Sequence, residues 1–119
     1  MREIIFRAKT VCDGDWVYGG ITWNPSKKEV FIHTEWDEGK VIPETVGQYT
    51  GLCDKNGTRI FEGDIVKVEN ALVRGIFAVE YCGISACFIV SHGERRYFLG
   101  GCNSEVIGNI HDNPELLKE

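Results

Sequence analysis

The sequence predicts a mostly β protein with one short helix near its C-terminal end. Turn signals recur about every eight to twelve residues, which is typical of all-β sandwiches and barrels. The 14 glycines supply tight turns, and a hydrophobic content of 43% is enough for a core. Alternating apolar and polar runs between the turns indicate strands. We expect an N-terminal antiparallel β-meander followed by a small SH3-like β-barrel.

At 119 residues the chain is short enough to form a single domain. Within it we expect a meander subdomain over residues 1–44 and a barrel subdomain over residues 45–112. The short helix is expected over residues 113–119.

Three strands are predicted in the meander. Arg2–Lys9 and Glu29–Trp36 alternate, and Trp16–Trp23 is rich in aromatic and β-branched residues. The first two are expected to pair as a hairpin. Gly19 and Gly20, in the middle of the second, indicate a bulge or a close approach of two backbones. Residues 37–44 are expected only to close this part and connect it to the next.

The stretch Val46–Val68 joins two turns to a strand. Asp54-Lys55-Asn56-Gly57 favours a tight type I′ hairpin, because Asn and Gly tolerate positive φ. That hairpin returns Arg59–Phe61 toward Gly47–Gly51. Glu62-Gly63-Asp64 forms the next turn and leads into the β-branched strand Ile65–Val68.

Further strands and one helix are predicted in the remaining sequence. Asp112 or Asn113 is expected to N-cap a short helix with a proline in its first position. The predicted elements are strands Ile76–Tyr81, Ala86–Ser91, Arg96–Leu99 and Glu105–His111, and the helix Pro114–Lys118.

Several blocks of sequence carry a family resemblance from one end of the chain to the other. They are Arg2-Glu3-Ile4, Phe6-Arg7-Ala8, Thr45 to Leu52, Asp54 to Gly57, Glu62 to Val66, Ile107 to Ile110 and Asn113 to Leu117. In this order and spacing they resemble the YopX family, small phage and prophage proteins without an established function. The resemblance implies a mostly β fold, a phage or prophage setting and a homo-oligomer. It implies no catalytic residues, and its motifs contain a candidate site of Gln48, Tyr49, Glu62 and Asp64.

The net charge of −5 and the pI near 5.2 argue against a nucleic-acid-binding role, because phosphate contacts require a basic face. No apolar run approaches the roughly 20 residues that span a bilayer. The first residues do not resemble a signal peptide, because charge returns at Arg7. We therefore expect a cytoplasmic protein without membrane partners.

The five cysteines favour buried thiols over a disulfide framework or a metal site. Their number is odd, and no Cys-x-x-Cys pair is present. Cys82, Cys87, His92 and Cys102 are candidate zinc ligands, but they lack a closely spaced pair on one turn. No metal and no other cofactor are expected.

Enzyme chemistry is not expected. Cys53 stands beside Asp54, whose carboxylate disfavours a thiolate. Glu62 and Asp64 suit acid–base chemistry if buried together, but an exposed turn with Asp64 bonded to backbone N–H groups is favoured. The sequence also contains no Walker-type loop and no G-x-G-x-x-G motif.

The predicted function is that of a non-enzymatic phage accessory protein acting through protein–protein contacts. Large aromatic residues are dense in the meander and indicate an interface for a homo-oligomer, or for another phage or host protein. These residues are Trp16, Tyr18, Trp23, Phe31 and Trp36. The alternative is a nucleic-acid-binding barrel in phage replication or regulation that uses the basic-aromatic cluster Arg95, Arg96 and Tyr97.

Overall fold

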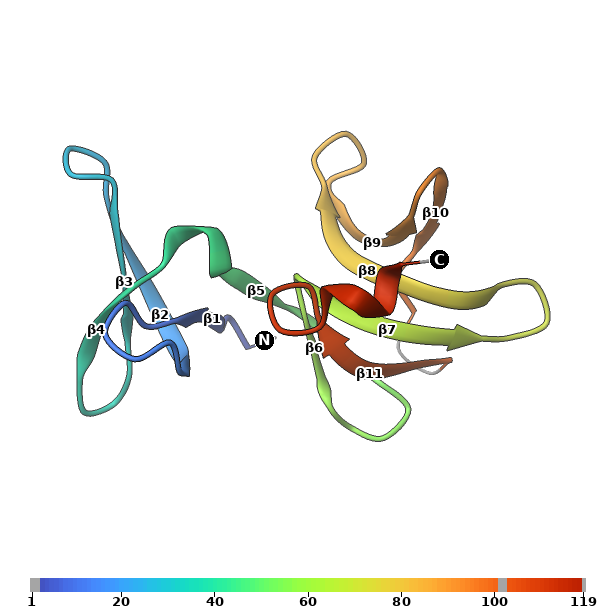
Figure 1. Cartoon of the computed structure of the whole chain (residues 1–119), viewed down its shortest axis with the longest axis horizontal. Coiled ribbons are helices and arrows are strands. Elements are labelled where there is room, and N and C mark those ends of the chain that lie inside the picture. Colours follow the sequence, from blue (N-terminus) through green and yellow to red (C-terminus); the bar gives the residue numbers. More distant parts are fainter. Residues whose placement is uncertain (1–2, 101–102, 119) are drawn as a thin grey trace. The chain divides into compact units, whose positions relative to one another are not determined.

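The computed structural model describes residues 3–100 and 103–118 and consists mostly of antiparallel strands (Figure 1). The mostly β prediction is confirmed. The chain divides into two compact units, Met1–Tyr49 and Thr50–Glu119, hereafter the N-terminal and C-terminal units. The division falls inside strand β5 (Gly47–Cys53).

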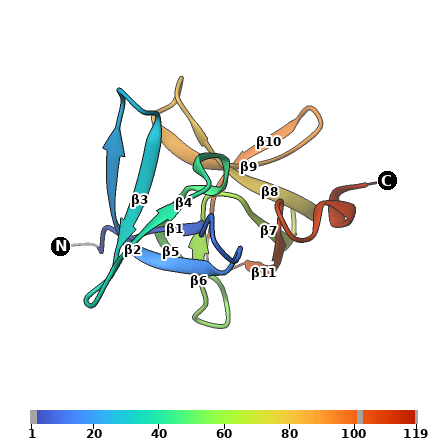
Figure 2. The ribbon, with the colours of Figure 1, turned by 60° about the vertical axis from the view of Figure 1, so that its left-hand side comes forward.

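The N-terminal unit contains the predicted antiparallel meander. Its strands are hydrogen-bonded in the order β4-β3-β2-β1, and β1 also pairs with the start of β5. Figure 2 shows β2 and β3 running side by side as a hairpin. The elements are β1 (Phe6–Lys9), β2 (Trp16–Asn24), β3 (Glu29–His33), β4 (Glu38–Val41) and a 3-10 turn, η1 (Pro43–Thr45).

The core of this unit lies on one face of the meander. Directly opposite residues in an antiparallel pair project to the same side, so Ala8 and Val17 share a face, as do Val30 and Val41. The buried cluster is Ala8, Val30, Ile32 and Val41, with Phe6, Val17 and Val46 packed against it.

Gly19 is a point of close backbone approach within the meander. An ideal Cβ at this position would lie 1.9 Å from the carbonyl oxygen of His33, whereas one at Gly20 would meet nothing within 4 Å. The predicted close approach is therefore found, and only Gly19 requires it.

Two strand boundaries in the meander differ from the prediction. β3 ends at His33 instead of Trp36, because Thr34 begins a turn. The Thr34 hydroxyl oxygen accepts hydrogen bonds from the N–H groups of Trp36 (3.3 Å) and Asp37 (3.1 Å). The chain then returns as β4, which was predicted as connecting chain because its Glu-Gly-Lys sequence shows no apolar alternation.

β1 begins at Phe6, later than predicted, and Arg2 lies outside the described residues.

The C-terminal unit contains a five-stranded antiparallel sheet in the order β10-β9-β8-β7-β11, together with the pairing of β5 and β6. Its core is Ile60, Val66, Phe77, Val79 and Val90. The strands are β6 (Arg59–Phe61), β7 (Asp64–Glu69), β8 (Arg74–Cys82), β9 (Cys87–His92), β10 (Arg95–Phe98) and β11 (Ser104–Asn109).

The expected SH3-like barrel is not found. β10 and β11 occupy the two edges of the five-stranded sheet, and no ladder joins those edges within the described part of the chain. Short strands separated by glycine turns occur in sandwiches as well as in barrels. The sequence pattern therefore did not distinguish an open sheet from a closed one.

The turn after β5 folds the chain back as predicted, but it is not type I′. Its two backbone hydrogen bonds run from the Gly57 N–H to the Asp54 carbonyl (3.0 Å) and from the Asp54 N–H to the Thr58 carbonyl (2.8 Å). Among residues 54–58 only Gly57 has a positive φ, of 84°. Type I′ requires positive φ at both central residues, so this is a three-residue loop with a left-handed glycine.

The predicted turn at Gly63 is confirmed, with a φ of 92°. The Gly63 N–H donates to the Val79 carbonyl at 2.8 Å, and the Gly63 carbonyl accepts from the Ile110 N–H at 2.9 Å. This turn therefore connects the β6–β7 segment to β8 and to the chain that follows β11.

The expected C-terminal helix is not found as an α-helix. Pro114–Leu117 forms a single 3-10 turn, η2, and Asn113 at the N-cap position makes no capping hydrogen bond. The Asn113 Oδ1 instead accepts from the Asn109 N–H at 3.2 Å. An ideal Cβ at Gly108 would lie 2.7 Å from the same Oδ1 atom, so Gly108 leaves space for this side chain.

Candidate functional site

The five aromatic residues predicted as a protein interface all lie in the N-terminal unit, but on more than one face. Strand alternation places Trp16 and Tyr18 on one face of β2 and Trp23 on the other. Phe31, on β3, is in register with Thr22, which alternation places on the same face of β2 as Trp16 and Tyr18. Trp36 lies in the loop between β3 and β4.

These aromatic residues also differ in exposure. Trp36 is 91% exposed, Trp23 54% and Tyr18 50%, and we call these three the exposed aromatic set. Trp16 is half-buried, and the guanidinium carbon of Arg7 lies 4.7 Å from the centroid of its ring. Trp16 therefore contributes to the packing of the meander, whereas the exposed aromatic set is available for contacts with other molecules.

Gln48 and Tyr49, the first two candidate family-motif residues, lie in β5 within the N-terminal unit. Gln48 is in register with Phe6 of β1. The Tyr49 N–H donates to the Ile5 carbonyl at 2.8 Å, and Tyr49 is buried. Both residues thus help to hold β5 against the first strand.

Glu62 and Asp64, the other two family-motif residues, flank Gly63 in the C-terminal unit. Asp64 is 2% exposed, and its Oδ2 accepts a hydrogen bond from the Phe61 N–H at 2.7 Å. The expected bond from Asp64 to backbone is confirmed, but the turn is buried there and not exposed. Because Asp64 is buried and bonded to the backbone, its role is to stabilise this turn.

Asp54 is a buried carboxylate. The sequence favoured Asp54 as a turn residue over part of a calcium loop, and it did not predict the burial. Its Oδ1 accepts from the N–H groups of Asn56 and Thr58, both at 2.9 Å, and its Oδ2 accepts from the Val106 N–H at 2.9 Å. Burial acts to raise the pKa of Asp54, but the three donors outweigh burial and lower the pKa below its ordinary value of 3.8. The turn sequence signals the two local bonds, but nothing in it signals Val106.

The basic-aromatic cluster forms β10, an exposed edge strand. The Arg95 guanidinium donates to the Arg74 carbonyl at 2.9 Å, and its carbon lies 4.8 Å from the centroid of the Phe77 ring. Alternation directs Arg96 to the opposite face from Arg95 and Tyr97. The three residues proposed for nucleic-acid contact therefore do not share one face.

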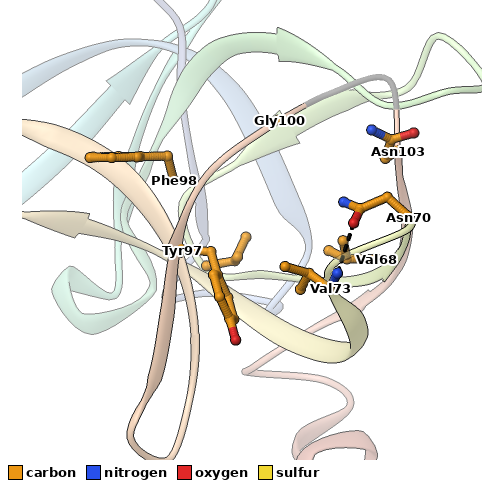
Figure 3. Close-up of a pocket in the computed structure, with 8 residues that line it drawn as sticks. Val68, Asn70, Val73, Tyr97, Phe98, Gly100 and Asn103 are labelled. Atoms are coloured by element: carbon orange, nitrogen blue, oxygen red, sulfur yellow. Dashed lines mark hydrogen bonds between the residues drawn. The ribbon is translucent and has the colours of Figure 1, made fainter.

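A small pocket of about 90 Å³ lies beside the side of β10 that carries Tyr97 (Figure 3). Asn70 shapes its wall, because its Oδ1 accepts from the N–H groups of Leu72 (2.8 Å) and Val73 (2.7 Å). This volume is well below the roughly 300 Å³ at which small-molecule sites begin. Its lining is Val68, Asn70, Val73, Val90, Tyr97, Phe98, Gly100 and Asn103.

A larger pocket of about 400 Å³ lies beside the thiol of Cys82. It combines apolar side chains with one guanidinium group and with two residues that carry hydroxyl groups. Its lining is Cys82, Ser85, Ile89, Arg96, Tyr97 and Phe98. The sequence favoured Cys82 as a buried thiol over a metal ligand and did not predict this pocket. The turn at Gly83, between two predicted strands, was the signal for pairing Cys82 with Cys87.

The remaining cysteines and histidines do not extend these sites. The expectation of buried thiols is wrong for the four described cysteines, because Cys12 and Cys53 are exposed and Cys82 and Cys87 are partly exposed. Cys102 lies outside the described residues. A ring nitrogen of His92 bonds to the Ile76 carbonyl at 2.9 Å. Within residues 3–100 and 103–118, no three His, Cys, Asp or Glu side chains gather closely enough to hold a metal ion. In the same part of the chain, no helix has the length and apolar character needed to cross a membrane.

The fold and these surfaces define a small antiparallel β protein of two units that displays aromatic side chains on one unit and a thiol pocket on the other. The chain belongs to the YopX family, because the family model described as YopX protein matches residues 6–118. No curated protein matches the chain.

The chain is also similar to a solved structure, that of protein EF1440 from Enterococcus faecalis. The similarity covers 99% of this chain and 100% of that chain, with 24% sequence identity and a TM-score of 0.64. At this level of identity the likeness establishes the fold alone.

Proposed function

We propose that this YopX-family chain is a non-enzymatic accessory protein of a phage or prophage. In this proposal it works in the cytoplasm through protein–protein contacts and self-associates through the exposed aromatic set of its N-terminal unit. The observation that carries the proposal is Trp36, a tryptophan that is 91% exposed.

The chemistry of the exposed aromatic set supports a protein contact. Trp and Tyr dominate the energy of protein interfaces, since they bury large areas with few rotatable bonds. Burial is worth about 25 cal/mol per Å² of apolar surface, so leaving three such side chains in water forgoes several kcal/mol. Tyr18 and Trp23 lie on opposite faces of β2, so a partner that covers any of the three side chains recovers part of that free energy.

The charge of the N-terminal unit supports a second copy as the partner. Residues 1–49 carry six Lys or Arg against eight Asp or Glu. Two identical surfaces with such balanced charge repel each other weakly, and a two-fold interface requires a self-complementary surface. Ion pairs such as Lys40 with Glu29, at 2.8 Å, already neutralise part of this charge locally.

The test is light scattering on a sizing column at micromolar concentration, in low and high salt. We expect an oligomer that persists in high salt, because apolar contacts are not screened. Trp36→Ser combined with Trp23→Ser should shift it to monomer. Leu72→Ser, which removes a 94% exposed apolar residue from the C-terminal unit, is the matched control and should leave the oligomer intact.

A wild-type monomer throughout the micromolar range would overturn the proposal. The same column run with a mixed oligonucleotide pool tests the nucleic-acid alternative. A shift with oligonucleotide in low salt that disappears in high salt would favour that alternative, because phosphate contacts weaken steeply with salt. Arg95 and Arg96 would then be the first residues to substitute.

A further inference from the structure

Two cysteines face each other across the β8–β9 hairpin. Cys82 is the last residue of β8, Cys87 is the first of β9, and they are direct register partners. Directly opposite residues of an antiparallel pair have Cα atoms about 4.5 to 5.5 Å apart and project to the same face. Disulfides span Cα separations of about 4.4 to 6.8 Å. The register therefore places the pair within the range of Cα separations that a disulfide spans.

Both sulfur atoms are thiols in the structure, and both residues are partly exposed. Reactive cysteines occur in such partly exposed places near positive charge, whereas fully buried thiols are inert. Cys82 and Cys87 are thus both accessible and paired with each other in register.

The surroundings of Cys82 favour its thiolate. The N–H and hydroxyl groups of Ser85, the N–H of Ile84 and the positive charge of Arg96 all act to favour the charged form of the sulfur. These donors lower the pKa of Cys82 below its ordinary value of 9.0. Since a thiolate is the attacking species, Cys82 is the first nucleophile of the pair and Cys87 the second.

The pocket beside Cys82 indicates what kind of molecule reacts there. Arg96 lies in it, and a guanidinium group recognises carboxylates through paired hydrogen bonds. Ile89 and Phe98 are register partners and supply apolar walls. A volume of about 400 Å³ admits a small organic molecule.

We propose that Cys82 is a modification site for low-molecular-weight disulfides that carry carboxylates, with Cys87 as the resolving thiol. The thiolate of Cys82 attacks one sulfur of the disulfide RSSR, forms a Cys82–SR bond and releases RS⁻, which takes a proton from solvent. Cys87 then loses its proton to solvent, attacks the Cys82 sulfur and releases the second RS⁻, which is protonated in turn. The protein dithiol is oxidised by two electrons, and RSSR is reduced to two RSH. This inference does not depend on self-association.

The experiment exposes the full chain to glutathione disulfide, a carboxylate-bearing disulfide, and maps each cysteine by mass spectrometry after alkylation. Wild type should gain a Cys82–Cys87 disulfide. Cys87→Ser should accumulate the mixed disulfide at Cys82 faster than at Cys12, an exposed internal reference thiol. Cys82→Ser should form neither product at this hairpin.

The role of Arg96 has its own control. Arg96→Gln should slow the reaction of Cys82 with glutathione disulfide by at least about fivefold, and should leave or raise the rate with the cationic disulfide cystamine. Circular dichroism confirms that each variant is folded. Equal rates at Cys82 and Cys12 in Cys87→Ser, or oxidation of wild type without a Cys82–Cys87 bond, would overturn the site. An Arg96→Gln effect that is the same for both probes would overturn the carboxylate specificity.

Discussion

The carboxylate of Asp54 accepts a hydrogen bond from the backbone N–H of Val106, 52 positions further along the chain, at 2.9 Å. The same carboxylate accepts two N–H groups of its own loop. One side chain therefore fixes the β5–β6 turn and also attaches it to β11. Asp54 is buried, and removal of its carboxylate would take the charged acceptor from all three of these donors.

We predict that Asp54→Ala lowers the free energy of unfolding by about 2 to 4 kcal/mol, since three backbone donors lose one charged acceptor and the turn loses its bond to β11. Urea unfolding followed by circular dichroism measures the change. Glu94→Ala, in the exposed turn between β9 and β10, is the control and should stay within about 0.5 kcal/mol of wild type. A similar effect of both substitutions would contradict the role of Asp54.

The lowered pKa of Asp54 makes its contribution depend on pH. A carboxyl group whose folded pKa is depressed stabilises the fold above its unfolded pKa, near 3.8, and this stability is lost as the pH falls through the folded value. Unfolding free energies measured from pH 5 to pH 2 should fall more steeply for wild type than for Asp54→Asn. The difference in slope has an upper limit of about 1.4 kcal/mol per pH unit. Parallel curves would show that Asp54 titrates normally.

Gly19 and Gly20 form a natural matched pair for a steric test. A Cβ at Gly19 would overlap the His33 carbonyl oxygen at 1.9 Å, so β2 and β3 would have to separate. We predict that Gly19→Ala costs at least about 3 kcal/mol or prevents folding. Gly20→Ala should change stability by less than about 1 kcal/mol, because its Cβ would meet nothing within 4 Å. Thermal unfolding of both variants, compared with wild type, measures whether Gly19→Ala loses more stability than Gly20→Ala.

Gly108 and Asn113 should be energetically coupled. Gly108→Ala introduces a Cβ at 2.7 Å from the Asn113 Oδ1, and we predict a cost of about 1 to 3 kcal/mol. Asn113→Ala removes the acceptor of the Asn109 N–H and should cost about 1 kcal/mol. The double variant should cost less than the sum, because the overlap disappears with the Asn113 side chain. Strict additivity in a double-mutant cycle would be the contrary result.

Local patterns in the sequence predicted the parts of the fold that depend on neighbouring residues. Alternation identified β3, aromatic and β-branched residues identified β2, and glycine identified the turn at Gly63. The local patterns failed to predict a strand where backbone pairing alone makes one. An example is β4, whose Glu-Gly-Lys segment has no apolar period. The local patterns also failed for the type I′ turn, because an Asn-Gly pair fits a three-residue loop equally well.

Sheet closure and the thiol site depend on contacts between distant segments. Nothing local in Arg95–Phe98 says that this strand ends a sheet instead of closing a barrel. The pairing of Cys82 with Cys87 was predictable from the sequence, because the two cysteines flank a short loop between predicted strands. The position of Arg96 beside them depends on a third strand and has no signal in the sequence.

The division of the chain inside β5 limits how this protein can be dissected. Tyr49 and Thr50, the residues on either side of the division, are both buried in an uninterrupted strand. A gene fragment that stops at residue 49 or starts at residue 50 ends in mid-strand. The first fragment keeps the Tyr49 bond to Ile5 but loses the rest of β5. The second keeps the Thr50 bond to the Ile60 carbonyl but loses the start of β5. The units are therefore poor building blocks for chimeras, and a graft from a relative has to carry β5 whole.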